Sequence, residues 1–193
     1  PNVLVVHPDR PFKTLKDIVD FARANPGKLD YGYTYASSGH MAMELLRQAT
    51  ATCADPKKKL NCNPLPIVGI PYRGGGPAIA DLIAGHVPAY FANLSEGMQF
   101  AKSDAIRLLA ISDTKRSPLL PDVPTMTEAG FDGFRVITWN GLLTRAGTAP
   151  DIIARTNAVV KEAIADPSIR SKLDAIGVTP LGDTPAEFAK TIA

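Results

Sequence analysis

Three consecutive glycines, Gly74, Gly75 and Gly76, stand between two strongly patterned stretches of the chain. The apolar residues 67–70 before them predict a buried strand, and the apolar spacing in residues 77–84 after them predicts an amphipathic helix. A glycine turn between a strand and a helix lets the backbone approach a ligand and leaves the first helical N–H groups without partners. We therefore expect this turn to bind an anion.

Arg73 and Pro77 flank the three glycines and refine this prediction. Pro77 suits the first position of the helix, where its missing N–H is not needed. Arg73 adds a positive charge whose planar fork matches a carboxylate or a phosphate. The turn lacks the third glycine of a dinucleotide fingerprint and the Gly-Lys-Ser/Thr ending of a P-loop, so a nucleotide is not expected. The alternative is a strand-to-helix connection that binds no ligand.

A second turn of small residues comes earlier in the chain and joins a predicted strand, residues 29–35, to a predicted helix, residues 41–51. A serine of this turn can cap that helix, which is the simple interpretation. In open α/β sheets, however, ligands gather at the carboxyl ends of the strands, and two helix N-termini facing one crevice would clamp a carboxylate. The candidate ligand-binding residues of this turn are Thr34, Tyr35, Ala36, Ser37 and Ser38.

Asn93 is a further candidate, because it ends a strand predicted at residues 87–93 and its amide can both donate and accept hydrogen bonds. The alternative is that Asn93 caps the helix predicted at residues 94–101. Either role places this side chain where a strand ends and a helix begins.

Strand and helix patterns alternate through residues 2–112, which predicts βαβ units, a largely parallel sheet and the α/β class. Three prolines within residues 113–124 then interrupt this rhythm, as expected for a crossing between lobes. The other predicted strands cover residues 2–6, 106–112, 134–138 and 178–181, and the other predicted helices cover residues 14–25, 125–129, 150–165, 167–177 and 184 onward.

The composition argues against several other classes of protein. The chain of 193 residues has a net charge of only +2, and its one basic run, Lys57, Lys58 and Lys59, has no aromatic residues among it. We therefore expect a solvated surface there and no nucleic-acid partner. No apolar run approaches the roughly 18 to 20 residues that cross a bilayer. The histidines lack the spacing of metal ligands, so neither a metal nor a cofactor is expected.

Cys53 and Cys62 bracket a polar loop and are the only cysteines in the sequence. A zinc site would need two further ligands nearby, so a disulfide is the simpler interpretation. A disulfide implies an oxidising compartment, which for a bacterial protein is the periplasm.

The sequence does not contain a familiar arrangement of catalytic residues. The Gly-x-Ser-x-Gly elbow of α/β hydrolases does not occur, and Ser38 and His40 lie too close together on a turn for one to be aimed at the other. We therefore expect no catalytic residues and a binding protein rather than an enzyme. The alternative from another class is a small serine hydrolase that uses Ser38 and His40.

Several stretches together resemble one family, the periplasmic solute-binding proteins of tripartite tricarboxylate transporters, also called the Bug family. Each stretch is weak evidence by itself, but their order over nearly the whole chain is specific. The matching stretches are PNVLVV at 1–6, KTLKD at 13–17, NPGKL at 25–29, SSGH at 37–40, EL at 44–45, PYRGGGPA at 71–78, DLIAG at 81–85, KRSP at 115–118, LPDVPT at 120–125, EAG at 128–130, WNGLL at 139–143 and AGT at 146–148.

The resemblance implies two α/β lobes with largely parallel sheets, similar to type II periplasmic binding proteins, that close on a ligand like a Venus flytrap. Residues 8–112 would form one complete ligand-binding lobe. Residues 1–7 and 113–193 would supply the crossing segments and part of the other, incomplete lobe. The N-terminal portion of the family, which carries the other glycine-rich ligand loop, has no match here, so we expect an N-terminally incomplete chain.

The resemblance also implies a function. Such proteins capture a small carboxylate, which could be a di- or tricarboxylate, an aromatic acid or an amino acid, and deliver it to integral membrane transporter subunits. They hold the oxygens of the ligand largely through backbone amides and water. A monomer in the periplasm is expected. The sequence leaves open a ligand-sensing lobe that acts on a signalling protein.

Two features depart from the family pattern. The turn before His40 carries fewer glycines than usual, and the loop between Cys53 and Cys62 looks like an insertion. Tyr33 and Tyr35, close to the predicted pocket, favour an aromatic or otherwise larger acid.

Overall fold

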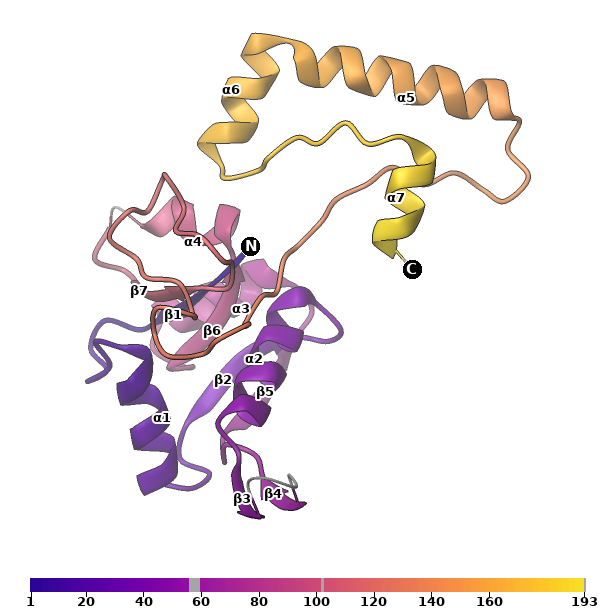
Figure 1. The fold of residues 1–193 in the computed structure, drawn as a ribbon. Coiled ribbons are helices and arrows are strands. Elements are labelled where there is room, and N and C mark those ends of the chain that lie inside the picture. Colours follow the sequence, from indigo (N-terminus) through magenta and orange to yellow (C-terminus); the bar gives the residue numbers. More distant parts are fainter. Residues whose placement is uncertain (56–59, 102, 193) are drawn as a thin grey trace. The chain divides into compact units, whose positions relative to one another are not determined.

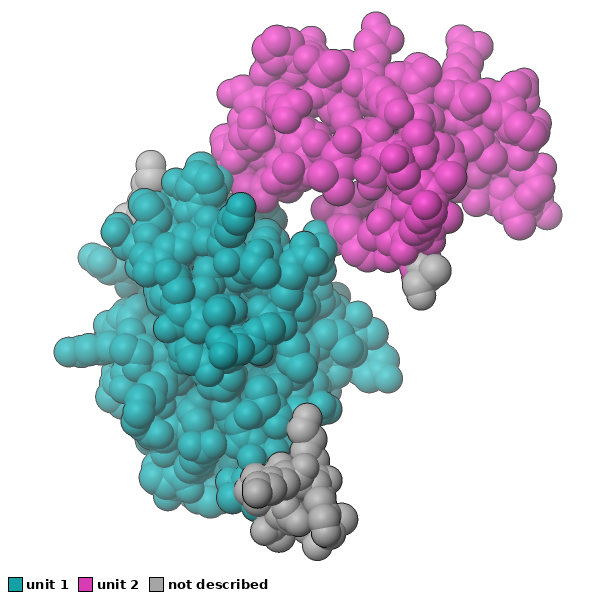
Figure 2. Space-filling view, in the orientation of Figure 1, with its two compact units in different colours: residues 1–138 teal, residues 139–193 magenta. Residues whose placement is uncertain are grey.

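The computed structural model describes residues 1–55, 60–101 and 103–192 of the chain (Figure 1). Residues 1–138 form one compact unit and residues 139–193 form a second, coloured separately in Figure 2. The prediction for Lys57, Lys58 and Lys59 lies outside the described residues. The predicted ligand-binding residues all lie in the first unit.

A five-stranded sheet forms the centre of the first unit, with strand order β5-β2-β6-β1-β7 in the described part of the chain. β2 is parallel to both β5 and β6, whereas β1 is antiparallel to its neighbours β6 and β7. Four strands therefore point the same way, which confirms the α/β class and makes the sheet mixed but largely parallel. The strands are β1 (Asn2–Val6), β2 (Asp30–Thr34), β5 (Val68–Tyr72), β6 (Ala89–Asn93) and β7 (Arg107–Ile111).

Helices cover both faces of this sheet. α1 (Leu15–Ala24) and α2 (Ser38–Ala49) bury their apolar residues in one cluster, and α3 (Gly75–Ile83) and α4 (Leu94–Phe100) bury theirs in a second. The apolar strand β1 serves both clusters, because Leu4 and Val6 belong to the first while Val3 and Val5 belong to the second. A strand buried on both faces explains the continuous apolar run in the sequence.

Local signals set the ends of these helices. Thr14 caps α1 and forms a capping box with Asp17, and Asn25 ends that helix. Gly85 follows α3 with a φ of +80°, a conformation that glycine adopts without strain.

Two predictions about the glycine turn were wrong in detail. β5 lies at the edge of the sheet and Val68 is 42% exposed, so this strand is not buried. α3 begins at Gly75, so Pro77 occupies the third helical position rather than the first. This position tolerates proline as well, because N–H groups throughout the first turn lack intrahelical partners.

Residues 113–138 belong to the first unit but do not form the helix and the strand predicted for them. Residues 125–129 form a turn rather than a helix, and residues 134–138 do not form a strand. Instead, Ser112 fastens this segment, because its carbonyl accepts from the N–H of Val136 at 2.9 Å and its hydroxyl donates to the carbonyl of Val136 at 2.6 Å. These two hydrogen bonds to Val136 hold the segment in place, but they do not make it a strand of the sheet.

The second unit is helical throughout its described elements, α5 (Pro150–Ala165), α6 (Pro167–Ala175) and α7 (Pro185–Ile192). These helices confirm the predicted ones, but the strand predicted at residues 178–181 is absent from the described structure. Within the described ranges, no helix combines the length and the apolar character needed to span a membrane.

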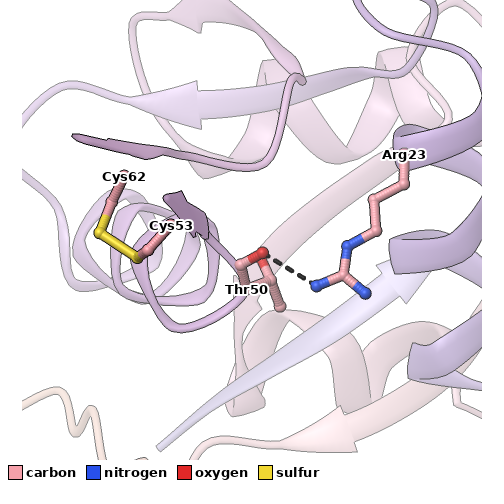
Figure 3. The surroundings of a disulfide bond; sticks show 4 residues. All are labelled: Arg23, Thr50, Cys53 and Cys62. Carbon is pink, nitrogen blue, oxygen red and sulfur yellow. Dashed lines mark hydrogen bonds between the residues drawn. A yellow bond between two sulfur atoms is a disulfide. The ribbon is translucent and has the colours of Figure 1, made fainter. Parts of the chain in front are cut away.

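A disulfide joins Cys53 and Cys62, as predicted (Figure 3). The two cysteines lie opposite each other in an antiparallel hairpin made of β3 (Thr52–Asp55) and β4 (Leu60–Asn63). Close to this hairpin, the guanidinium of Arg23 donates to the carbonyl of Thr50 at 3.0 Å and so links α1 to the end of α2. No group of three potential metal ligands occurs among the described residues.

Candidate functional site

The ends of three neighbouring strands bring the predicted ligand residues to one edge of the sheet. β5, β2 and β6 lie side by side and run parallel, so their carboxyl ends meet where the turns into α2, α3 and α4 begin. β1 runs the opposite way, which places its first residue, Asn2, opposite Asn93. We call this region the carboxyl edge, and it is the candidate site.

The turn from β2 into α2 is closed by its own hydrogen bonds. Ser37 is the N-cap of α2 and accepts from the N–H of His40 at 3.2 Å, which confirms the capping interpretation. Ala36 has a φ of +56°, a left-handed conformation that favours glycine, and its N–H donates to Nδ1 of His40 at 3.3 Å. Sequence reasoning did not predict this strain at Ala36.

The first turn of α2 packs directly on β6. A Cβ on Gly39 would overlap the carbonyl oxygen of Phe91, so only glycine fits between the helix and the strand. Ser38, the preceding residue, is the first residue of α2 and is therefore held beside the end of β6.

Two tyrosines contact His40 at this turn. The rings of Tyr33 and His40 stack with centroids 4.4 Å apart, and the ring of Tyr35 lies 5.8 Å from that of His40 at an interplanar angle of 42°. Tyr35 is 80% exposed, whereas Tyr33 is partly buried. Of the two, Tyr35 is therefore the ring that a ligand can reach.

The glycine turn opens α3 without a side-chain cap. Gly74 is the N-cap, Gly76 is exposed at the second helical position, and Arg73 is exposed beside them. A Cβ on Gly75 would overlap the carboxylate of Glu96, so the N-terminus of α3 already faces a negative charge of the protein. An anion bound at this turn would need the charge of Arg73 to offset that of Glu96.

Tyr72 anchors the glycine turn to the body of the unit. Its ring packs over Gly32, and its hydroxyl donates to Oδ2 of Asp81 on α3 at 2.7 Å. Burial, followed by this hydrogen bond, raises the pKa of Tyr72 to about 12, so the phenol stays neutral at physiological pH. The same bond, together with one from His86, lowers the pKa of Asp81.

Asn93 caps α4 and also faces the carboxyl edge. The carboxylate of Glu96 accepts from the backbone N–H of Asn93 at 3.0 Å and from its Nδ2 at 3.3 Å, which confirms the capping interpretation. Because Nδ2 points to Glu96, the amide oxygen of Asn93 points away from it, and this oxygen accepts from the hydroxyl of Thr138 at 2.8 Å.

Four polar side chains, Asn2, Ser38, Asn93 and Thr138, meet at the carboxyl edge, and we call them the edge cluster. Ser38 Oγ lies 3.0 Å from Oδ1 of Asn2 and 2.8 Å from Oγ1 of Thr138. Asn2 is fully buried, and its backbone N–H donates to the hydroxyl of Ser112 at 2.9 Å.

Sequence reasoning identified two members of the edge cluster, Ser38 and Asn93, and missed Asn2, Thr138 and the neighbouring Glu96. A signal for Asn2 was present, since it is the one polar residue of the buried strand β1. Thr138 gave no such signal, because it lies 100 residues from Ser38 along the chain.

The geometry does not pair Ser38 with His40 as a nucleophile and its base. Ser38 Oγ bonds to Asn2 and Thr138, while Nδ1 of His40 accepts from the backbone of Ala36. No hydrogen bond joins the two side chains among the described residues, so this structure offers no support for the hydrolase alternative.

Two hollows of the first unit lie away from the predicted ligand residues. One of about 460 Å³ is lined by the end of α4 and residues 119–123, and another of about 250 Å³ is lined by α2 and residues 130–134. None of the predicted ligand residues lines either hollow. The candidate site is therefore identified by its converging groups and not by cavity volume.

Comparison with known proteins places the whole chain in one group. Residues 1–193 match the family model described as tripartite tricarboxylate transporter family receptor. The UPF0065 protein in the tcbD-tcbE intergenic region of Pseudomonas sp. (strain P51) is 34% identical over 191 residues, which are 98% of this chain and 53% of the relative. Protein BugT of Bordetella pertussis is 30% identical over 194 residues, which are 100% of this chain and 56% of BugT.

Solved structures show the same fold. The structure of R. palustris Rpa4515 with adipate matches with a TM-score of 0.88 at 30% identity, covering 100% of this chain and 60% of that chain. A structure described as a periplasmic transporter matches with a TM-score of 0.84 at 34% identity, covering 99% of this chain and 60% of that chain. The fold is thus that of periplasmic binding proteins, as predicted, and this chain spans about half to three fifths of the length of these proteins.

Proposed function

The chain belongs to the tripartite tricarboxylate transporter receptor family, and we propose that it binds a small carboxylate in the periplasm and delivers it to membrane transporter subunits. The structural relative Rpa4515 was solved with adipate, a dicarboxylate, which supports an acid as the ligand. The disulfide between Cys53 and Cys62 supports the periplasm, where such bonds persist.

One observation carries the proposal of an anionic ligand. The parallel strands β2 and β5 end side by side, and the N-termini of α2 and α3 follow them at the carboxyl edge. Helix N-termini present unpaired N–H groups and a partial positive charge, which suit a carboxylate. The exposed guanidinium of Arg73 adds a full charge at the same edge.

The predicted residues contribute to the proposed site in different ways. Backbone N–H groups of the glycine turn and the fork of Arg73 hold the carboxylate oxygens, while Ser38 and Asn93 offer side-chain hydrogen bonds. The exposed ring of Tyr35 favours an acid with an apolar or aromatic body. The residues proposed to form the ligand site are Thr34, Tyr35, Ala36, Ser37, Ser38, Arg73, Gly74, Gly75, Gly76 and Asn93.

The proposed lobe, residues 8–112, supplies four strands of the described sheet, and β1 with residues 113–138 completes the same compact unit. Binding is proposed to favour a closed form of a monomeric protein, which the transporter then recognises. The ligand shifts the equilibrium to that form by its higher affinity for it.

A thermal-shift panel on the full-length protein tests this proposal. Adipate, malate and benzoate are compared with adipamide, glucose and ATP at equal ionic strength. At least one acid should raise Tm while adipamide, which keeps the adipate skeleton without its charges, does not. A ligand at about 100 times its Kd stabilises by about 2.7 kcal/mol, which is readily measured. Stabilisation by glucose or ATP but by none of the acids would contradict the proposal.

Arg73→Gln locates the site within this test. Loss of a charge-assisted hydrogen bond should weaken binding of the stabilising acid about 10-fold to 100-fold. Arg10→Gln is the matched control, because Arg10 is also exposed but follows the carboxyl end of β1 and so lies at the opposite edge of the sheet. If Arg73→Gln binds the acid as tightly as Arg10→Gln does, the glycine turn is excluded as the anion site.

A further inference from the structure

The edge cluster contains three close contacts of hydrogen-bond length, but its two hydroxyl groups supply only two hydrogen atoms. Ser38 and Thr138 each carry one hydroxyl hydrogen. Ser38 Oγ is 3.0 Å from Oδ1 of Asn2, Thr138 Oγ1 is 2.8 Å from Oδ1 of Asn93, and the two hydroxyl oxygens are 2.8 Å apart. If each hydroxyl donates to an amide oxygen, the contact between the hydroxyls has no hydrogen.

The orientation of the two amides decides how this shortage is resolved. Asn93 is fixed, because its Nδ2 donates to the carboxylate of Glu96, and turning the amide would place two oxygens together. Asn2 is not fixed in this way, because its buried Nδ2 has no hydrogen-bond partner among the described residues. Turning the Asn2 amide by half a revolution keeps every heavy-atom contact and lets Nδ2 donate to Ser38.

With Asn2 turned, the hydrogen bonds of the edge cluster form one directed chain. Nδ2 of Asn2 donates to Ser38, Ser38 donates to Thr138, and Thr138 donates to Oδ1 of Asn93. Every contact in the chain then has a hydrogen, and the buried Nδ2 of Asn2 gains the hydrogen-bond partner that it otherwise lacks. In this arrangement the one hydroxyl hydrogen of Ser38 is already committed to Thr138.

We propose that Thr138 is a positioning residue of the ligand site, which accepts the hydrogen bond of Ser38 in the free protein and loses it to the carboxylate of a bound ligand. This inference rests on the function proposed above. A hydrogen bond to a carboxylate is roughly twice as strong as one to a neutral hydroxyl, so the ligand wins the competition. Ligand binding at Ser38 then leaves Thr138, the last residue of the first unit, with its hydrogen bond to Asn93 but without the one from Ser38.

The residue after Thr138 reports on this change. Trp139 is the only tryptophan in the sequence and begins the second unit, where its ring lies edge-on to Phe188 with centroids 5.2 Å apart. Loss of the Ser38 hydrogen bond at Thr138 changes the freedom of the backbone at Trp139. Its fluorescence should therefore respond to ligand even though Trp139 is not one of the proposed ligand residues.

The test compares Thr138→Val with Thr138→Ser in the full-length protein, using adipate and malate as probes. Valine keeps the shape of threonine but cannot accept the hydrogen bond, so the ligand no longer competes with residue 138 for the hydroxyl hydrogen of Ser38. Thr138→Val should bind the acid about 3-fold to 10-fold more tightly than the unaltered protein and should show little change in tryptophan fluorescence on binding. Thr138→Ser, which restores the hydroxyl, should restore both the affinity and the fluorescence change.

The outcomes separate this inference from the proposed function. If the unaltered protein binds neither acid by calorimetry, the proposed carboxylate ligands and the inference both fail. If the unaltered protein binds an acid but Thr138→Val keeps its affinity and its full fluorescence change, the inference alone is overturned. Weaker binding in Thr138→Val would also overturn it, since a purely structural role for Thr138 predicts a loss.

Discussion

The two units of this chain use the same kind of amphipathic helix and bury it to very different degrees. In α1, Leu15 and Ile18 are each 2% exposed, whereas in α5, Ile152 and Val159 are 53% and 57% exposed. None of the described residues of α5, α6 and α7 is buried. The first unit contains a sheet whose two faces the helices cover, and no strand occurs in the described part of the second.

The local signals for a helix are therefore independent of the apolar surface against which the helix packs. α5 starts with Pro150, and α6 is capped by Asp166, which accepts from two backbone N–H groups of the first turn. Such caps define where a helix begins and contribute about 1 kcal/mol each. Burial against a sheet contributes more, because each apolar side chain removed from water adds roughly 1.5 to 3 kcal/mol.

Truncation of one apolar side chain in each unit should give the largest difference in the free energy of unfolding. Leu46→Ala in α2 removes a side chain that is 0% exposed and should cost about 2 to 5 kcal/mol of unfolding free energy. Val159→Ala in α5 should cost less than about 1 kcal/mol, because that side chain is more than half exposed. Urea denaturation of both variants measures this difference. A cost for Val159→Ala equal to that of Leu46→Ala would show that α5 is buried as deeply as α2.

A single added methyl group tests how tightly the first unit is packed at the candidate site. Gly39→Ala would push a Cβ into the carbonyl oxygen of Phe91 and should cost about 3 kcal/mol. Gly76→Ala is the matched control, because nothing lies within 4 Å of its added Cβ. The midpoint of urea denaturation should fall for the first variant and stay or rise for the second. A tolerated alanine at position 39 would mean that α2 is free to move away from β6.

Removal of the disulfide tests whether the hairpin and the sheet of the first unit unfold together. Replacing Cys53 and Cys62 by alanine opens a loop with a sequence separation of 9 residues and should cost about 2 to 3 kcal/mol by the loop-entropy estimate. Thermal denaturation with and without reductant gives the measurement, and the alanine variant should be insensitive to reductant. An unchanged Tm would show that the hairpin and the sheet unfold independently of each other.

The loss of stability at low pH should change only slightly when one helix-capping carboxylate is removed, and to a similar extent in both units. Hydrogen bonds from the N–H groups of Lys13 and Thr14 lower the pKa of Asp17 below its ordinary value of 3.8, and hydrogen bonds from Ser168 chiefly lower that of Asp166. A carboxyl with a lowered pKa stabilises the fold above its unfolded pKa, and this contribution is lost as the pH falls through the folded pKa.

Asp17→Asn and Asp166→Asn should therefore each flatten the decrease of Tm between pH 5 and pH 2. Asp166 is exposed and Asp17 is only partly buried, so the two changes should be small and similar, in contrast to the large difference expected between the cores. A flattening for Asp17→Asn alone would show that the α6 cap does not contribute to the measured unfolding.

Local interactions made much of this protein predictable from its sequence. The caps Thr14 and Ser37, the stop at Gly85 and the disulfide depend on residues a few positions apart, so the chain itself specifies them. Residues 2–6 likewise form the predicted strand, β1, and its continuous apolar run agrees with burial on both faces of the sheet. The family resemblance was carried by such short stretches, and the match of the whole chain to the family model confirms it.

Pairings between distant residues were decided only by the tertiary structure. The antiparallel course of β1 between β6 and β7 sets Asn2 opposite Asn93, and the sheet order leaves β5 at the edge. The tertiary fold brings Thr138 into contact with Ser38, although the two residues are 100 positions apart in the sequence. Sequence periodicity records which faces of an element are apolar, but strand order and long-range hydrogen bonds depend on the packing of all elements together, which no local stretch encodes.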